Sequence, residues 1–298
     1  MHGQTFLKLM RFLGHQEWLR FGFRDLIIRY FVNLDIISSW EYETNFFGFR
    51  YKGNLNSFLD WYVYFYGAYE KEVLFFLRDL VSKRVDPIFL DVGANVGQHS
   101  LFMSKYCQQV HAFEPYEKVR NRLLEKITLN NIDNITVHGV GLGDRDEYLD
   151  YYAPIGANLA TGSFLPGHGR NNNRLLGKLK LVKGDDFLSS LNLDRVDLIK
   201  IDVEGFEQFV LIGLKETIAT YRLWIFLEFS ESTQETLSNS RGLSEILPAG
   251  YDILEFNVYN ILDYSLIFSS VSTNLKKFDF SKHHVNLVLK HGDQLYFC

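Results

Sequence analysis

Residues 89–97 read Phe-Leu-Asp-Val-Gly-Ala-Asn-Val-Gly, an apolar run that stops at an acid and then opens into a turn with two glycines. This pattern is typical of a buried strand followed by a helix, where the backbone comes close to a ligand. Gly93 and Gly97 lack a Cβ atom, so the chain can turn sharply and bring peptide N–H groups to a bound molecule. Any tight strand-to-helix turn also favours glycine, and the rest of the chain must decide between the two interpretations.

A second strand-like run, residues 110–115, ends in the lone carboxylate of Glu114. In a parallel nucleotide-binding sheet, an acid at the end of the second strand is placed to bind both hydroxyls of a ribose. The spacing of Gly93 and Gly97, with Asp91 just before them, differs from the Gly-x-Gly-x-x-Gly pattern of dinucleotide sites. A negative charge there disfavours a pyrophosphate and favours a sulfonium or ammonium group. The two segments together predict an adenosine-containing cofactor such as S-adenosylmethionine (SAM).

Three further segments support an open α/β sheet. Residues 137–144 are predicted to form a third short strand that ends at Asp144, which is placed to bind an adenine amino group. Residues 196–205 put a lysine and two carboxylates at the end of an apolar strand, and residues 223–228 form a fifth strand that ends at an acid. Charged groups thus collect at the carboxyl ends of successive strands, where such sheets bind their ligands.

With these motifs in this order, the sequence resembles the FkbM-type SAM-dependent methyltransferases over roughly residues 60–230. The resemblance implies an α/β class I methyltransferase fold, which is Rossmann-like, with a mostly parallel seven-stranded sheet and helices on both faces. It also implies methyl transfer to a hydroxyl of a sugar, a glycan or a small natural product. The segments that carry it are Asp91-Val92-Gly93-Ala94-Asn95-Val96-Gly97, Phe113-Glu114-Pro115, Leu142-Gly143-Asp144 and Lys200-Ile201-Asp202-Val203-Glu204-Gly205.

The resemblance also implies a cofactor site. It is expected to contain Asp91, Gly93, Ala94, Asn95, Gly97, Glu114 and Asp144. The family's Tyr-Gly-x-Tyr-Glu segment matches residues 66–70, so Tyr66 and Glu70 are candidates near the methionine end of the cofactor. Core packing is the commoner fate of aromatic side chains, and this chain has many to bury.

An alcohol is a poor nucleophile unless a base takes its proton during the attack, and a carboxylate with a raised pKa can be that base. Asp202 and Glu204 are the candidate bases. Lys200 lies two residues before Asp202 and therefore on the same face of the strand, where it would set the local charge. Glu228 would orient the acceptor or Lys200. The alternative is a buried ion pair that only shapes the edge of the sheet.

Hard metal ions need several oxygen ligands, and no compact Asp/Asn cluster follows Asp202, so we expect no metal. His99, beside the cofactor turn, is expected to be a structural hydrogen-bonding group rather than a catalyst.

The composition excludes several classes of protein. A net charge of −5 and a pI near 6.0 give no electrostatic footprint for nucleic acid. Two cysteines, Cys107 and Cys298, are too few for a disulfide framework and suggest a reducing compartment. No apolar stretch approaches the ~20 residues that cross a bilayer, and charged residues interrupt the start of the chain where a signal peptide would be apolar. We therefore expect a cytoplasmic protein without a transmembrane segment.

Two parts are expected: an N-terminal extension at residues 1–60, helical with a short hairpin at 46–53, and a catalytic domain at residues 61–298. The pattern at residues 6–32 is typical of amphipathic helices. These helices would bind a membrane surface or, as we favour, pack on the catalytic domain or on a second copy of the chain.

Residues 251–256 and 285–290 are predicted to form the final antiparallel strands. Residues 257–284 are expected to form a lid or acceptor-binding flap or, equally, a disordered or oligomer-contacting insertion. Residues 153–177 are rich in glycine and asparagine, and they are expected to be mobile and to lie beside the active site. Other functions stay open at this point: a non-catalytic SAM-fold binding module, a methyltransferase for a nitrogen or protein acceptor, or a dinucleotide oxidoreductase.

Overall fold

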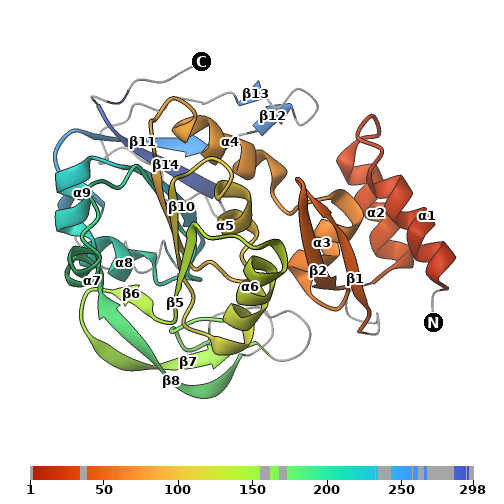
Figure 1. Ribbon diagram of the computed structural model, residues 1–298, viewed down its shortest axis with the longest axis horizontal. Helices are drawn as coiled ribbons and strands as arrows, with labels where there is room; N and C mark the ends of the chain where they lie inside the picture. The colour runs from red at the N-terminus through yellow and green to blue at the C-terminus, as the bar shows by residue number, and fades with distance from the viewer. Residues whose placement is uncertain are drawn as a thin grey trace.

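The centre of the structure is a seven-stranded sheet with the strand order β11–β14–β10–β9–β3–β4–β5 (Figure 1). Strand β14 runs antiparallel to both of its neighbours, and the other strands are parallel to one another. This is the predicted class I methyltransferase fold, with the expected antiparallel pair at one edge. The strands are β3 (Ile88–Val92), β4 (Gln109–Phe113), β5 (Ile135–His138), β9 (Leu198–Ile201), β10 (Trp224–Phe229), β11 (Tyr251–Phe256) and β14 (Val285–His291).

The computed structural model describes residues 3–33, 39–154, 162–167, 173–231, 233, 243–256, 258–260, 265–266, 285–292 and 294. Among these residues, no helix combines the length and the apolar character that a membrane span requires.

Two apolar clusters cover the two faces of the sheet, because side chains alternate along a strand. Phe89 and Leu198 belong to the first cluster, and their neighbours Leu90 and Ile199 belong to the second. The first cluster contains α4 (Lys71–Val81), α5 (Gln98–Met103) and α6 (Glu117–Asn130), and the second contains α7 (Gly184–Ser190), α8 (Glu207–Gly213) and α9 (Lys215–Tyr221). Figure 1 shows the two sets of helices on opposite sides of the sheet.

The N-terminal part contains two helices, a hairpin and a third helix: α1 (Gln4–Gly14), α2 (Phe21–Phe31), β1 (Glu41–Phe46), β2 (Phe49–Asn54) and α3 (Phe58–Tyr66). The predicted hairpin and helical pattern are therefore confirmed. Helix α1 can pack closely on α3 because Gly14 has no side chain; a Cβ atom there would lie 2.1 Å from the carbonyl oxygen of Phe65. Figure 1 shows α1 and α2 at the end of the molecule away from β11.

Asp60 joins the N-terminal part to the catalytic domain. Its fully buried carboxylate accepts hydrogen bonds from the Tyr51 hydroxyl (2.8 Å) and the Asn54 amide (2.9 Å), and it pairs with Arg122 of α6. These contacts link α3, β2 and α6 through one side chain. A buried carboxylate is tolerated because each of its oxygens has a partner.

The prediction of one strand at residues 137–144 is wrong. Strand β5 ends at His138, and Gly141–Gly143 forms β6 in a separate three-stranded sheet with β7 (Glu147–Ala153) and β8 (Arg174–Lys183). The chain bends at residues 139–140, where a glycine interrupts the run. Both short strands are largely apolar, so the sequence reads as a single strand.

The two predicted irregular stretches are shorter than expected where the structure describes them. Strand β8 already begins at Arg174, and Val258–Asn260 (β12) pairs with Ser265–Leu266 (β13). Residues 155–161, 168–172, 257, 261–264 and 267–284, which make up about half of the first stretch and most of the second, lie outside the described residues, as does Cys298.

Replacing Asp60 by Ala should destabilise the protein by about 3 kcal/mol or more, because Arg122 and the Tyr51 hydroxyl would lose their buried partner. The matched control is Glu125→Ala, which removes the exposed ion pair with Lys52 (3.3 Å) and should cost less than about 1 kcal/mol. Urea denaturation followed by circular dichroism measures both values. Equal losses in the two variants would contradict the role given to Asp60.

Candidate functional site

The register of the sheet brings the predicted charged residues together. Asp91 of β3 lies beside Lys200 of β9, and Lys200 lies beside Phe226 of β10. Asp202 lies two residues after Lys200, and Glu228 lies two residues after Phe226. Because side chains alternate along a strand, these four side chains and that of Asp91 project from the face that α4 and α5 cover. The site is thus assembled by strand pairing before any loop contributes to it.

Lys200 is the buried centre of this group, with only 3% of its surface exposed. Its Nζ lies 2.9 Å from Oδ2 of Asp202 and 4.0 Å from Oδ1 of Asp91. Burial by itself lowers the pKa of Lys200, but Asp202 and Asp91 outweigh this effect and raise the pKa above its ordinary value. The ammonium group therefore stays charged inside the sheet.

Asp202 and Glu228 share a hydrogen bond. Burial favours the neutral form of Asp202, but Lys200 and the hydrogen bond from Glu228 outweigh burial and lower the pKa of Asp202. The charge of Asp202, together with burial and Glu204, raises the pKa of Glu228 well above its usual range. At neutral pH the proton is thus held by Glu228, and Asp202 is a carboxylate.

A cavity of about 320 Å³ opens over this pair of acids. The side chains of Phe58, Leu59 and Phe226 form its apolar wall. Eight of the predicted site residues line it: Glu70, Gly93, Ala94, Asn95, Lys200, Asp202, Glu204 and Glu228. The structure therefore brings all four predicted catalytic residues to one cavity, next to the turn that follows β3.

Three residues that line the cavity have positive φ although they are not glycine: Glu70 (46°), Asn95 (52°) and Glu204 (53°). Each lies in a connection next to the sheet edge: before α4, between β3 and α5, and between β9 and α8. The left-handed conformation is unfavourable for residues with a Cβ atom, and such residues concentrate at active sites and ligand clamps. Their grouping here marks the cavity as a functional site.

Glu114 does not line the cavity but lies directly beside the turn after β3. One of its carboxylate oxygens accepts the N–H of Asn95 (3.0 Å) and the other accepts the N–H of Tyr116 (2.8 Å). Burial outweighs these bonds and raises the pKa of Glu114 to about 7. The carboxylate is held in place, and each oxygen keeps a lone pair that can accept a further hydrogen bond.

Gly93 and Gly97 are required for close packing. A Cβ atom on Gly93 (φ 83°) would lie 1.8 Å from the carbonyl oxygen of Asp202, and one on Gly97 (φ 86°) would lie 2.1 Å from Leu123. The N–H groups of Gly93 and Ala94 both donate to the carbonyl oxygen of Phe113. The glycines thus allow β3, β9 and α6 to approach one another.

Three further predicted residues lie outside the described lining of the cavity. The carboxylate of Asp91 is fully buried, accepts a hydrogen bond from Ser100 Oγ (2.5 Å) and acts on the site through Lys200. Asp144 follows β6, with its carboxylate 3.7 Å from Arg145. The hydroxyl of Tyr66 donates to Asp25 of α2 (3.1 Å), within the N-terminal part.

Tyr69 occupies the position that the sequence led us to expect for Tyr66. It lines the cavity, and burial followed by the charges of Glu70, Asp202 and Glu228 raises its pKa. The side-chain amide of Gln98 fixes it, accepting from the Tyr69 N–H (2.7 Å) and donating to the Tyr69 carbonyl (2.8 Å). The Tyr-Gly-x-Tyr-Glu segment contains both tyrosines, so the sequence signal was present but did not distinguish them.

His99 also lines the cavity, and its functional position was missed. The side chain is 8% exposed, and its Nε2 atom has no hydrogen-bond partner. Burial and then the charge of Lys200 lower the pKa of His99 well below its ordinary value, so the imidazole is neutral. A buried polar atom without a partner, facing a cavity, is suited to contact a ligand.

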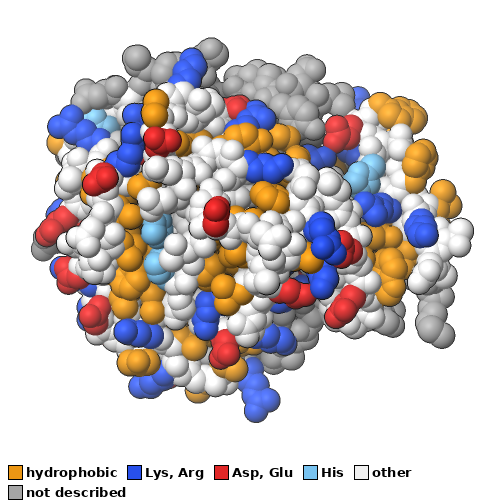
Figure 2. All heavy atoms as spheres, in the orientation of Figure 1, with side chains coloured by type: hydrophobic (Ala, Val, Ile, Leu, Met, Phe, Trp, Pro, Cys, Tyr) orange, Lys and Arg blue, Asp and Glu red, His pale blue; other side chains and the backbone are white. Residues whose placement is uncertain are grey.

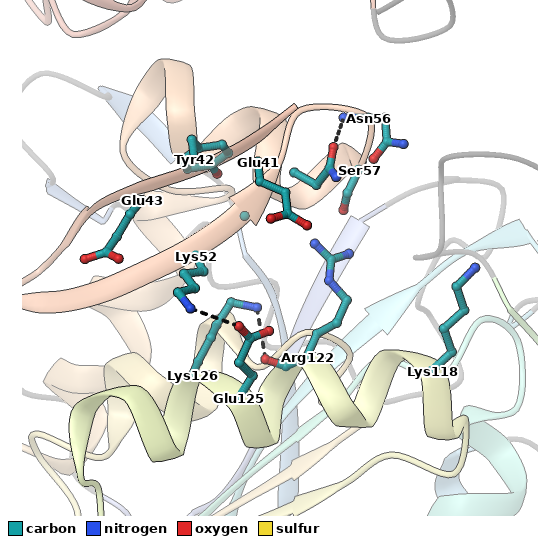
Figure 3. A pocket seen from close by; sticks show the side chains of 12 residues that line it. Glu41, Tyr42, Glu43, Lys52, Asn56, Ser57, Lys118, Arg122, Glu125 and Lys126 are labelled. Carbon is teal, nitrogen blue, oxygen red and sulfur yellow. Dashed lines mark hydrogen bonds and ion pairs between the residues drawn. The ribbon is translucent and has the colours of Figure 1, made fainter. Parts of the chain in front are cut away.

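A second and larger cavity, about 540 Å³, lies between the β1–β2 hairpin and α6 (Figure 3). Figure 3 shows Arg122 pointing from α6 toward Ser57 and Glu41 at the end of the hairpin, while Lys52 pairs with Glu125. Its lining has mixed charge and does not include the Lys200 group. Consecutive residues line the two cavities: residues 56 and 57 line this one, and residues 58 and 59, at the start of α3, line the first.

Among the residues that the structure describes, no group of three or more His, Cys, Asp or Glu side chains is arranged to hold a metal ion.

Comparison with known proteins gives matches among methyltransferases. The 2-O-methyltransferase NoeI from Sinorhizobium fredii is 27% identical over 197 residues, which are 60% of this chain and 79% of NoeI. The hexuronic acid methyltransferase AglP from Haloferax volcanii is 28% identical over 134 residues, which are 45% of this chain and 52% of AglP. The AMB antimetabolite synthetase AmbE from Pseudomonas aeruginosa is 27% identical over 205 residues, which are 57% of this chain but only 10% of AmbE.

A crystal structure of an FkbM methyltransferase from Methylobacillus flagellatus superposes with a TM-score of 0.44 at 18% identity, over 68% of this chain and 43% of that one. Residues 91–256, more than half of the chain, match the family described as the methyltransferase FkbM domain. They include the strands and connections that carry most of the cavity. The chain therefore belongs to the FkbM methyltransferase family.

Proposed function

We propose that this protein is a SAM-dependent O-methyltransferase that methylates a hydroxyl of a sugar, a glycan or a small natural product. The observation that carries the proposal is the position of Asp202, which pairs with Lys200 (2.9 Å) and lines a cavity beside the turn after β3. The names of two relatives, a 2-O-methyltransferase and a hexuronic acid methyltransferase, support an oxygen acceptor on a sugar.

The residues present fit SAM. Four carboxyl side chains line the cavity (Glu70, Asp202, Glu204 and Glu228). Glu228 holds a proton, but the other three outnumber Lys200, the only cation among the described lining residues. Such a lining favours a ligand with a positive sulfonium and ammonium group. The anchored oxygens of Glu114 suit the two ribose hydroxyls, and Nε2 of His99 is available for a polar group of the ligand. When bound, SAM would supply an electrophilic methyl carbon.

The side chains around the cavity then need to orient the acceptor and take its proton. Asp202 would accept the hydroxyl proton as the methyl group passes from the cofactor sulfur to the acceptor oxygen. Its lowered pKa differs from the raised pKa expected of a base, so its place at the cavity, rather than its basicity, supports this role. Tyr69 offers a polar group that positions the acceptor. Phe58, Leu59 and Phe226 exclude water from the reacting atoms, which strengthens these electrostatic interactions.

The neighbouring polar cavity favours an acceptor larger than one sugar residue. Residues 56 and 57 line it and the next two residues, at the start of α3, line the first cavity, and its lining contains amide, hydroxyl, carboxylate and cationic side chains. These groups are able to hydrogen-bond several sugar hydroxyls at once. An extended glycan would place its reacting hydroxyl over Asp202 and its remaining units along the hairpin.

The direct test is methyl transfer from labelled SAM to a panel of oligosaccharides and monosaccharides, followed by mass spectrometry. We expect a gain of one methyl group on a hydroxyl. Calorimetric titration with SAM and with NAD separates this function from that of an oxidoreductase: SAM should bind and NAD should not. NAD binding without SAM binding would contradict the proposal.

Replacing Asp202 by Asn should lower the transfer rate by about 100-fold or more, since general-base catalysis contributes about 10²–10⁴. The affinity for S-adenosylhomocysteine should change only a few-fold. Asp186→Asn on α7 is the matched control, because that carboxylate is exposed and pairs only with Lys183 on the surface. Thermal unfolding checks that each variant is folded. A folded Asp202→Asn enzyme with normal turnover would exclude Asp202 as the base.

Replacing Glu114 by Ala should weaken binding of S-adenosylhomocysteine by about tenfold to 100-fold, because the ribose would lose hydrogen bonds to a charged group. Glu117→Ala, three residues later on the exposed side of α6, should leave the affinity unchanged. Isothermal calorimetry measures both. An unchanged affinity in the folded Glu114→Ala variant would remove Glu114 from the cofactor site.

The preference for SAM over S-adenosylhomocysteine should fall as the pH drops through about 7. Burial, with the charge of Asp202, raises the pKa of Glu70 to about 7, so Glu70 is an anion above this pH and neutral below it. Only SAM carries the sulfonium charge, and the ratio of the two affinities isolates its contribution. In Glu70→Gln the ratio should not depend on pH in this range. A wild-type ratio that stays constant between pH 6 and pH 8 would contradict this role, since roughly one pH unit on each side of the pKa spans the titration.

A further inference from the structure

The two N-terminal helices expose an unusual amount of apolar surface. Seven of the fourteen large apolar side chains that are exposed in the described part of the chain lie between residues 9 and 31, each between 46% and 80% exposed. They define what we call the α1–α2 face: Leu9, Phe12, Trp18, Phe23, Leu26, Tyr30 and Phe31. Contiguous exposed apolar patches on a protein usually mark a binding surface.

The fold of the chain itself does not use this face. Leu7 and Met10 of α1 and Ile28 of α2 already bury the inner sides of the helices against the N-terminal core. Phe23 and Tyr30 lie seven residues apart and therefore on one side of α2, away from Ile28. The helices have one apolar side for the core and additional apolar residues facing the solvent.

Positive charge surrounds these apolar residues. The first 33 residues carry five lysines and arginines and two acids, whereas the rest of the chain carries 26 lysines and arginines and 34 acids. Lys8 and Arg20 are exposed, Arg29 is paired with Asp25 (2.7 Å), and Glu17 is paired with Lys71 (2.7 Å). Figure 2 shows basic and apolar side chains interspersed at the end of the molecule where Figure 1 places α1 and α2. The face is cationic on a protein that is otherwise anionic.

We propose that the α1–α2 face binds the surface of a lipid bilayer that contains anionic lipids. Each helix has 11 residues, about 16 Å, which is too short to cross a bilayer, so the helices lie in the plane of the interface. The apolar side chains enter the boundary of the acyl chains, and the cations contact anionic headgroups. Trp18 and Tyr30 have the amphipathic rings that are favoured at this depth.

The charge pattern favours a bilayer over a second copy of the chain. The acids of this patch, Glu17 and Asp25, are already paired with Lys71 and Arg29. A two-fold contact would therefore bring two patches of net positive charge together, with no free acid opposite Lys8 and Arg20. Like charges brought together in this way repel one another, whereas an anionic bilayer attracts all of them.

The test is flotation of the full chain with vesicles of phosphatidylcholine alone or of phosphatidylcholine mixed with phosphatidylglycerol. We expect binding to the mixed vesicles, little binding to the neutral ones, and a loss of binding at high salt. The double variants Phe12→Ser/Leu26→Ser and Lys8→Glu/Arg20→Glu should each bind the mixed vesicles at least about tenfold more weakly than the wild type. The matched control Leu124→Ser/Tyr148→Ser removes exposed apolar residues elsewhere and should bind like the wild type.

Retained affinity for S-adenosylhomocysteine and an unchanged unfolding temperature show that the variants are folded. The proposal is overturned if the wild type does not float with the mixed vesicles, if it floats equally with both, or if the control loses binding as the others do. It is also overturned if light scattering shows a dimer that Phe12→Ser/Leu26→Ser separates, since the face would then be a subunit interface.

Discussion

The charge of Lys200 is the constraint on which the site depends. An ammonium group in the middle of an apolar sheet is tolerated only when carboxylates balance it, and Asp91 and Asp202 lie beside it on the same face. Ser100 of α5 donates a hydrogen bond to Asp91, and the protonated side chain of Glu228 of β10 donates one to Asp202. One buried cation thus ties β3, β9, β10 and α5 together, and it leaves a carboxylate facing the cavity.

The connections around the cavity are fixed by side chains that hydrogen-bond the backbone, one from a distant part of the chain and one from nearby. Gln98 clamps the backbone of Tyr69, and the buried carboxylate of Glu207 accepts the N–H groups of Val203 (3.0 Å) and Gly205 (3.1 Å). These bonds flank Glu70 and Glu204 and hold both in the left-handed backbone conformation. The strain is therefore supported by the surroundings, and the cavity is preorganised before a ligand arrives.

The sequence predicts the sheet and the acids at its edge because each acid directly follows a short apolar run. Such a run is a signal that neighbouring residues carry by themselves. The sequence does not separate Tyr66 from Tyr69, since that choice depends on Gln98, 29 residues away, and on the conformation of Glu70. From the sequence, β5 and β6 are predicted to be one strand, because the residues at the bend between them are not polar enough to mark a break. The sequence also does not predict which apolar residues of α1 and α2 are exposed, because amphipathic spacing does not tell which of them the fold buries.

The central claim is that the carboxyl-lined cavity and Glu114 together bind a sulfur nucleoside. The most direct measurement is a crystal structure of the protein with S-adenosylhomocysteine. The account predicts the ribose hydroxyls on Glu114 and the sulfur facing Asp202 and Tyr69. Clear density for the nucleoside in the cavity between the hairpin and α6, with the Lys200 site empty, would contradict it.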